Sequence, residues 1–349
     1  MRWIAAIAIL AATAGAVGAA PPPIGGTLGA PAFWQAYKER FVSPAGRVID
    51  NANKGVSHSE GQGYGMLLAV AADDRPAFDL LWSWTRAQLM LRNDGLVAWK
   101  WDPDSTPHVA DRNDAADGDL LIAWALAEAG DQWPDGPYRI ASLQLANAVL
   151  QGDVLNTASG PTLLPAVKGY AAGARADGPV VNLSYWVFPA LWRFQSLAPD
   201  RPWGALAKSG AALAVAARFG AAKLPTDWIS LKDGPHPAKG FPPAFGYDAI
   251  RIPLYLVWAG MGTKANLAPY AALWADPAAP PQRLDATSGK SLEPMTDKGY
   301  LAIAALVRCA VTGAAIPPAL TGDDVDLYYP TTLRALVLIA AHQRYPQCL

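Results

Sequence analysis

The sequence has few cysteines, few histidines and no block of charge of one sign. Its 349 residues include two Cys and four His, and they contain no HExxH motif and no cluster of Cys and His. We therefore expect no metal ion and no cofactor in catalysis. The net charge is −1 without a basic patch, which argues against nucleic acid or a charged membrane surface as a partner.

Long uncharged runs are also absent after the first residues. The chain opens MRWIAAIAILAATAGAVGAAPPP, in which Arg2 precedes a short apolar run that ends in small residues. This pattern is typical of a secretory signal peptide. We assign residues 1–20 to that peptide and residues 21–349 to a single catalytic domain. We expect a periplasmic or secreted monomer with no membrane span in the mature chain.

The two cysteines, Cys309 and Cys348, leave two alternatives open. In an oxidising compartment they can form a disulfide that ties the C-terminal tail to a helix. They can equally remain two buried thiols, because a sequence does not report their separation.

Helical periodicity is the strongest local pattern, and strand-type alternation is nearly absent. Helices are predicted at 31–42, 59–72, 75–91, 115–129, 137–151, 183–197, 202–219, 247–260, 265–275, 297–312 and 328–343. Ten to twelve helices with no strand between them predict an all-α toroid of six helix hairpins. Long connections near 92–114, 152–182, 220–246 and 276–296 are expected to line a cleft at one end.

Large aromatic rings are abundant in a nearly neutral chain. The 14 Trp and 12 Tyr exceed what a core usually needs, and neutral sugars are commonly held by stacking on such rings. Most of these rings are nevertheless expected to belong to the core. The composition therefore favours a neutral, sugar-like substrate.

The segment SHSEGQGYGM, residues 57–66, places an acidic residue at a predicted helix start. Ser59 and Gln62 have the spacing of a capping box, which puts Glu60 in the first turn. Three glycines follow in this helix, where glycine is unfavourable. They indicate the close approach of another helix or of a ligand to the backbone.

Two further segments place acids at helix starts. In NDAADGDLLIAWALAEAGDQW, residues 113–133, Asp114 is a candidate N-cap, and Asp117 and Asp119 suit the helix dipole. In FGYDAIRIPLY, residues 245–255, Asp248 has Arg251 one turn later on the same face. Taken singly, each segment has an ordinary structural explanation.

Taken together, the segments resemble glycoside hydrolase family 8. The family signature is matched by Ala115, Asp117, Gly118, Asp119, Ile122, Ala123, Ala125, Leu126, Ala129 and Trp133. Ala116 departs from it, because the family usually has a hydroxyl residue there. FGYDAIRIPLY and DLYYPTTLRAL, residues 326–336, resemble two further family segments, so the resemblance spans nearly the whole mature chain.

The resemblance implies an (α/α)6 barrel with an open cleft and an inverting endo-β-1,4-glucanase. It implies Glu60 as general acid, Asp248 as general base and Asp117 as the carboxylate that holds a distorted sugar ring. We expect the charge of Asp117 to help Glu60 retain its proton. The most similar members are compact bacterial endoglucanases that accompany cellulose synthase, so cellulose and the cellulose synthase export machinery are the expected partners.

Sugar binding is expected to involve aromatic side chains close to these acids. The candidates are Tyr64, Trp99, Trp101, Tyr185, Trp186, Tyr247 and Tyr329, together with Arg251, which would either orient Asp248 or reach a sugar hydroxyl. Trp99 and Trp101 alternate, so only one of them should face the cleft if the backbone is extended. The alternative functions are a xylanase or chitosanase of the same family and a non-catalytic glucan-binding toroid.

Overall fold

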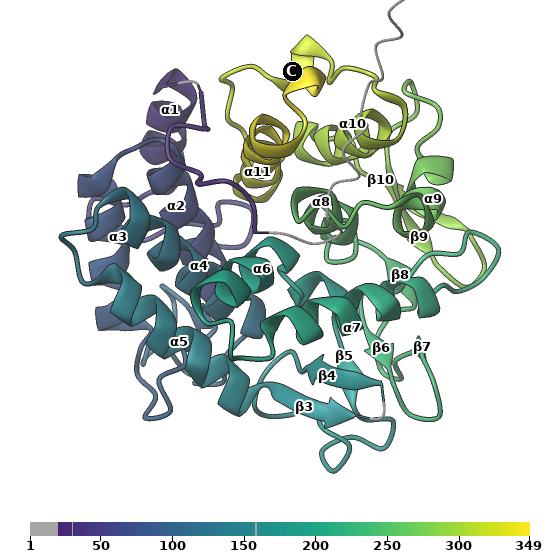
Figure 1. Ribbon diagram of the computed structural model, residues 1–349, viewed down its shortest axis with the longest axis horizontal. Helices are drawn as coiled ribbons and strands as arrows, with labels where there is room; N and C mark the ends of the chain where they lie inside the picture. Colours follow the sequence, from purple (N-terminus) through teal and green to yellow (C-terminus); the bar gives the residue numbers. More distant parts are fainter. Residues whose placement is uncertain (1–19, 30, 158) are drawn as a thin grey trace, which may run out of the picture.

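The computed structural model describes residues 20–29, 31–157 and 159–349, so the expected signal peptide lies almost wholly outside the described residues. This part of the chain forms eleven α-helices arranged in a ring (Figure 1). Their bounds are α1 (Pro31–Phe41), α2 (Ser59–Ala71), α3 (Arg75–Gln88), α4 (Ala116–Gln132), α5 (Tyr138–Gly152), α6 (Phe188–Leu197), α7 (Trp203–Ala216), α8 (Arg251–Trp258), α9 (Lys264–Leu273), α10 (Lys298–Thr312) and α11 (Tyr328–Arg344).

The helices form an (α/α)6 barrel with an inner ring and an outer layer. In the inner ring α2 packs on α4, α4 on α6, α6 on α8, and α8 on both α10 and α11, while α11 returns to α2. Inner helices bury most of their residues: 12 of the 13 in α2 and all 8 in α8 are buried. Outer helices such as α1 and α3 bury about a third, 4 of 11 and 5 of 14. An outer helix buries only the apolar stripe that faces the core, whereas an inner helix has neighbours on most of its sides.

A short 3-10 turn replaces one outer helix. Between α10 and α11 the described chain contains η2 (Pro318–Leu320) where an outer helix would complete the sixth hairpin. Pro317 and Pro318 lack the amide that a continuing helix needs. The barrel therefore has six inner α-helices and five outer ones in its described part.

The helix predictions are confirmed, whereas the prediction of no strands between helices is wrong. Ten strands of two to four residues form four small sheets: β1–β2, β3–β4, β5–β6–β7 and β8–β9–β10. Their bounds are β1 (Ser57–His58), β2 (Lys100–Trp101), β3 (Val154–Thr157), β4 (Gly160–Leu163), β5 (Val180–Val181), β6 (Ile229–Ser230), β7 (His236–Pro237), β8 (Ala244–Phe245), β9 (Gln282–Asp285) and β10 (Ser291–Pro294). All lie in or beside the long connections. Strands this short carry too few residues for a recognisable alternation.

The glycines of α2 and α4 allow these two inner helices to approach closely. A Cβ on Gly63 would lie 2.5 Å from the Leu121 Cβ, and one on Gly118 would lie 2.8 Å from the Glu60 amide nitrogen. The expected close approach is therefore that of a neighbouring helix. It brings the first turns of α2 and α4, which carry Glu60 and Asp117, against each other.

Two predicted helix caps are wrong. α2 begins after His58 without a side-chain cap, and Gln62 instead accepts the Val48 amide at 2.6 Å and donates to the Thr85 hydroxyl at 2.9 Å. Ala115, not Asp114, occupies the N-cap position of α4. Both polar side chains are buried, and each bonds to a backbone group far away in the sequence.

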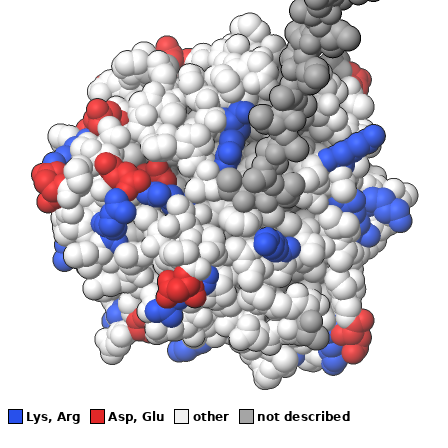
Figure 2. Space-filling view, viewed as in Figure 1, with Lys and Arg blue, Asp and Glu red and all other residues white. Residues whose placement is uncertain are grey.

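Cys309 and Cys348 form a disulfide, with their Cα atoms 5.9 Å apart. The bond links the last turn of α10 to the C-terminal turn η3 (Pro346–Cys348). None of the described helices is long and apolar enough to span a bilayer. On the face shown in Figure 2, acidic and basic residues are interspersed among uncharged ones.

Candidate active site

The inner helices begin at one end of the barrel, and the candidate site residues lie at these helix starts. Glu60 and Asp117 are each the second residue of their helix, and Asp248 stands three residues before α8. Tyr329 is the second residue of α11, and Tyr185 closes the 3-10 turn η1 (Leu183–Tyr185) before α6. Residues from distant parts of the chain, such as Tyr64 and Arg251 at a separation of 187 positions, therefore share one site.

Arg251 joins the three carboxylates. Its Nη1 contacts Glu60 Oε1 and lies 3.3 Å from Asp117 Oδ2, while its Nη2 donates to Asp248 Oδ1 at 3.1 Å. The guanidinium also donates to the Ser184 hydroxyl at 2.9 Å. Arg251 is buried, and of the two expected roles it fulfils the orientation of Asp248. Its other expected role, contact with a sugar hydroxyl, stays a prediction.

Glu60 and Asp248 are the more accessible acids of this group. Their side chains are 20% and 32% exposed, whereas that of Asp117 is 3% exposed. Two acids that contact one guanidinium and remain open to solvent can both reach a bound molecule. The structure thus brings together all three carboxylates that the sequence singled out.

Tyr64 is buried and is not a stacking platform. Its hydroxyl donates to Glu60 Oε1 at 3.2 Å, lies 2.7 Å from the Tyr255 hydroxyl and accepts from Arg251 Nη1 at 3.1 Å. The expected role in sugar stacking is therefore wrong. Tyr64 lies one helical turn after Glu60 on the same face of α2, so the Tyr64 hydroxyl can hold the Glu60 carboxyl in position.

Asp248 lies between a hydrogen-bond donor and a second carboxylate. Asn182 Nδ2 donates to Asp248 Oδ2 at 2.9 Å. Asp227 accepts the amides of Gly246 and Ala249, one on each side of Asp248 in the sequence. Burial, together with the nearby charge of Asp227, raises the pKa of Asp248 to about 7.

Asp117 occupies the most enclosed position. Its Oδ1 accepts the Gly118 amide at 2.8 Å, and its Oδ2 faces Arg251. Burial raises the pKa of Asp117 to about 7. One guanidinium therefore faces three carboxylates in a partly desolvated site, an arrangement that favours the retention of protons in the group.

Trp99 and Trp101 are both partly buried, but their rings have different neighbours. Trp101 is enclosed by Arg47, whose guanidinium lies 4.6 Å from the ring, and by His108 at 4.3 Å between ring centroids. The Trp99 ring lies parallel to His58 at 5.8 Å, and its Nε1 donates to the exposed Asp111. Trp99 is thus the ring that can meet a sugar beside Glu60, and Trp101 supports the loop.

Of the remaining aromatic candidates, Tyr185, Tyr247 and Tyr329 lie near Asp248, whereas Trp186 is buried. The Tyr329 hydroxyl donates to the Tyr247 carbonyl at 2.7 Å, and Tyr247 is 41% exposed. The Tyr185 ring is half-buried, 5.9 Å from the Arg251 guanidinium carbon. Trp186 is buried against Gly210, where an added Cβ would come within 2.3 Å of its ring. Its assignment to sugar binding is therefore wrong.

Several residues around the site were not found from the sequence. Asn182, Ser184, Asp227 and Tyr255 contact the catalytic group from loops or from the next turn of a helix. Asp227 precedes Trp228, whose ring is stacked on Tyr170 at 5.4 Å. A polar residue in an irregular loop gives no periodic signal, so only the tertiary structure identifies these partners.

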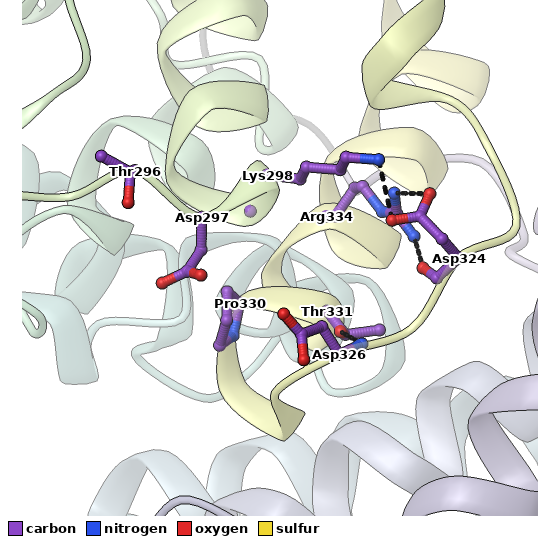
Figure 3. Close-up of a pocket in the computed structure, with 9 residues that line it drawn as sticks. Thr296, Asp297, Lys298, Asp324, Asp326, Pro330, Thr331 and Arg334 are labelled. Atoms are coloured by element: carbon purple, nitrogen blue, oxygen red, sulfur yellow. Dashed lines mark hydrogen bonds and ion pairs between the residues drawn. The ribbon is translucent and has the colours of Figure 1, made fainter.

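A separate pocket of about 170 Å³ lies at the starts of α10 and α11 (Figure 3). Lys298 and Arg334 both pair with Asp324 there, at 2.8 and 3.0 Å. The positive groups are therefore already matched by a carboxylate. The pocket is lined by none of the three candidate catalytic acids.

Accessible paired carboxylates flanked by aromatic rings at one end of an (α/α)6 barrel form the site of a glycoside hydrolase. The sequence matches the family model for glycosyl hydrolases family 8 over residues 5–343. The chain therefore belongs to glycosyl hydrolases family 8.

Similar proteins carry endoglucanase names. An endoglucanase of Cellulomonas uda is 45% identical over 241 residues, which are 68% of this chain and 66%, just under two thirds, of that protein. The structure of a family 8 endoglucanase from Klebsiella pneumoniae has a TM-score of 0.82 at 40% identity and covers 89% of this chain and 99% of that one. An endo-β-1,4-glucanase from Acetobacter xylinum has a TM-score of 0.82 at 35% identity, with 92% and 99% covered.

Proposed function

We propose that this chain is an endo-β-1,4-glucanase that hydrolyses internal bonds of cellulose with inversion of the anomeric configuration. The observation that carries the proposal is the convergence of Glu60 and Asp248 on Arg251 while both acids remain open to solvent. The endoglucanase names of relatives at 35–45% identity support β-1,4-glucan as the substrate.

In this mechanism each acid acts on one face of the sugar. Glu60 donates its proton to the glycosidic oxygen as the bond from that oxygen to the anomeric carbon breaks. A water molecule attacks the same carbon from the opposite face and gives its proton to Asp248. The raised pKa of Asp248 makes it a stronger base near neutral pH than an ordinary aspartate.

Asp117 and Arg251 prepare the site for this reaction. We assign Asp117 to holding the sugar at the cleavage point in a distorted ring, since it shares the Arg251 guanidinium with the two reacting acids. Arg251 fixes all three carboxylates through one rigid planar group. Its single positive charge faces three carboxylates, so it cannot balance the charges of all of them.

We further propose that the enzyme is a single exported domain that acts in the periplasm or outside the cell. The Arg2-led apolar N-terminus supports export, and the disulfide between Cys309 and Cys348 suits an oxidising compartment. Similarity to compact endoglucanases that accompany cellulose synthase favours action on glucan near the synthase export machinery.

The test combines substrate, stereochemistry and variants. New reducing ends are measured on carboxymethylcellulose, xylan and chitosan, and proton NMR follows the anomer first released from cello-oligosaccharides. We expect cleavage of the cellulose derivative with release of the α-anomer. Glu60→Gln and Asp248→Asn should each lower kcat about 10²- to 10⁴-fold, while the exposed-site control Asp200→Asn retains activity.

Other outcomes would assign another function. Binding of glucan without new reducing ends would indicate a non-catalytic toroid, and preference for xylan or chitosan would place the chain with other specificities of the family. Release of the β-anomer would contradict the inverting assignment of Asp248.

A further inference from the structure

A second group of acids lies beneath the start of α4, apart from the catalytic carboxylates. Asp114 precedes the helix, Asp119 lies in its first turn, and Asp153 caps the C-terminal end of α5. One carboxylate oxygen from each lies within 4.8 Å of the other two. All three residues are buried, with exposed fractions of 3%, 0% and 0%.

The surrounding protein satisfies this cluster only in part. Asp119 Oδ1 accepts the Val97 amide at 2.8 Å, and Asp114 accepts the Val167 amide at 3.2 Å. Asp119 Oδ2 and both carboxylate oxygens of Asp153 have no hydrogen-bond donor among the described residues. Buried oxygens without donors are uncommon, and each indicates a bound group or a proton that completes it.

The charge count indicates what completes the cluster. Three carboxylates carry three negative charges, and Arg92, whose Nη1 lies 3.4 Å from Asp114 Oδ1, brings one positive charge that it shares with Asp94. If all three carboxylates were ionised, at least two negative charges would be left uncompensated in this buried site, so the cluster needs either protons or a cation. Buried charges persist only when they are paired or coordinate a metal, and a divalent cation would balance these two.

The enclosure of the three carboxylates favours calcium among the hard cations, because Mg²⁺ usually keeps several of its waters and is seldom held by protein groups alone. Ca²⁺ binds carboxylate oxygens at about 2.3–2.6 Å, so two oxygens around one ion stand up to roughly 5 Å apart. Mg²⁺ binds at about 2.0–2.1 Å and limits that separation to roughly 4.2 Å. The upper bound of 4.8 Å for the three oxygens accommodates the calcium sphere.

We propose that Asp114, Asp119 and Asp153 form a Ca²⁺-binding site with a structural role. The ion would join the end of α5 to the start of α4, three residues before Asp117. It would also hold the segment that carries Trp99, because Asp119 binds the Val97 amide and Asp114 forms a β-bridge with Ala98. Calcium would therefore stabilise this corner of the active site without contacting the substrate.

A proton shared between Asp114 and Asp153 is the competing occupant. Burial, together with the charges of Asp114 and Asp119, raises the pKa of Asp153, so protonation would also relieve the repulsion. Calcium and protons differ in a measurable way. Bound calcium is detected as metal content and is removed by chelators, whereas a bound proton gives no metal signal and is not removed by chelators.

The experiment uses the full chain, stripped with EDTA and then dialysed into buffer with CaCl2, MgCl2 or EDTA. Metal content after gel filtration should be close to one Ca²⁺ per chain. The thermal midpoint should rise by several degrees in CaCl2 relative to EDTA, and by less in MgCl2. Equal midpoints in EDTA and CaCl2, with no calcium retained, would overturn the proposal in favour of protons.

Asp153→Asn separates the two occupants further. The neutral amide removes one negative charge, so this variant should retain no calcium and should show no response to CaCl2, while Asp200→Asn behaves like the wild type. Calcium binding by Asp153→Asn equal to that of the wild type would contradict the site. If the variant does not fold, calorimetric titration of the stripped wild type with CaCl2 decides: a stoichiometry near one supports the site, and no binding heat refutes it.

Discussion

Asp227 holds the backbone on both sides of Asp248, because its Oδ1 accepts the amides of Gly246 at 3.0 Å and Ala249 at 2.8 Å. The loop that carries Asp248 is thereby held in place by a second carboxylate. The same carboxylate places a negative charge close to the proposed base and contributes to its raised pKa. Asp227 therefore influences both the position and the proton affinity of Asp248.

Replacing Asp227 should shift the pH dependence of the reaction. The general base must be deprotonated, so activity rises with pH as Asp248 loses its proton. Asp227→Asn keeps an acceptor oxygen for the two amides but removes the charge, which lowers the pKa of Asp248 from about 7. The acidic limb of kcat/KM against pH should therefore move to lower pH. A limb that stays in place, or moves upward, would contradict this coupling.

Replacing Arg251 should impair catalysis more than substrate binding. Arg251→Lys keeps a positive charge but cannot contact Glu60, Asp117 and Asp248 through one rigid group. We expect kcat to fall about 10²- to 10³-fold, with KM changed by less than about threefold. Steady-state kinetics on a soluble cello-oligosaccharide measures both. A change in KM alone would instead assign Arg251 to sugar binding.

Trp99 and Trp101 form a matched pair for testing the cleft. Trp99→Ala removes a partly exposed ring and should raise KM about 3- to 10-fold, as expected for the loss of about 1 kcal/mol of stacking. Trp101→Ala removes a partly buried ring that contacts Arg47, Trp84 and His108, so it should lower the free energy of unfolding by about 1–3 kcal/mol. Urea titrations and steady-state kinetics on both variants distinguish the two roles. A loss of stability in Trp99→Ala together with a raised KM in Trp101→Ala would show that the roles are assigned the wrong way round.

Gly63 should not tolerate a methyl group. An alanine Cβ there would lie 2.5 Å from the Leu121 Cβ and 2.9 Å from the Ile122 amide nitrogen, so α2 and α4 must separate. We expect Gly63→Ala to lower the free energy of unfolding by about 1–3 kcal/mol and to reduce activity, since these helices carry Glu60 and Asp117. Gly173→Ala, where no atom lies within 4 Å of the added carbon, is the control. Equal unfolding curves for the two variants would refute the packing argument.

Loss of the disulfide should affect stability and leave catalysis intact. Cys309 and Cys348 are 39 residues apart, and a loop of this length predicts a loss of about 4 kcal/mol in the free energy of unfolding. Cys309 lies in the last turn of α10, at the opposite end of that helix from the site. The double variant Cys309→Ser and Cys348→Ser should therefore unfold at lower urea concentration with unchanged kcat at 25 °C. A large loss of kcat in the folded variant would contradict the view that the disulfide does not affect the active site.

The helical framework was predictable from the sequence because it depends on local periodicity. Each of the eleven predicted ranges contains an α-helix within a few residues of its bounds, and the apolar spacing that predicts them is the pattern that packs an inner or outer helix. The two-residue strands, such as β1 and β2, were missed because pairing between distant loops creates them. Gln62 and Asp114 misled the prediction of caps, since their partners lie outside their own helices.

The site was predictable in its acids and less so in its aromatic residues. Asp248 and Arg251 meet because they are three residues apart, but the contacts of Arg251 with Glu60 and Asp117 depend on how three inner helices, α2, α4 and α8, meet. Residue type alone does not say which way a ring points. Tyr64 and Trp186 therefore proved to be buried, and Tyr329 proved to be partly buried, with its hydroxyl on the Tyr247 carbonyl.

The closure of the ring by α11 has a consequence for the kinetics of folding. Asn51 bonds to the backbone of Tyr328 across 277 positions, and Tyr37 meets Thr332 across 295. Contacts between such distant segments form slowly, because a long loop must close before they gain stability. After dilution from denaturant, the far-ultraviolet signal of the helices should return first, and enzymatic turnover should recover only in the last and slowest phase.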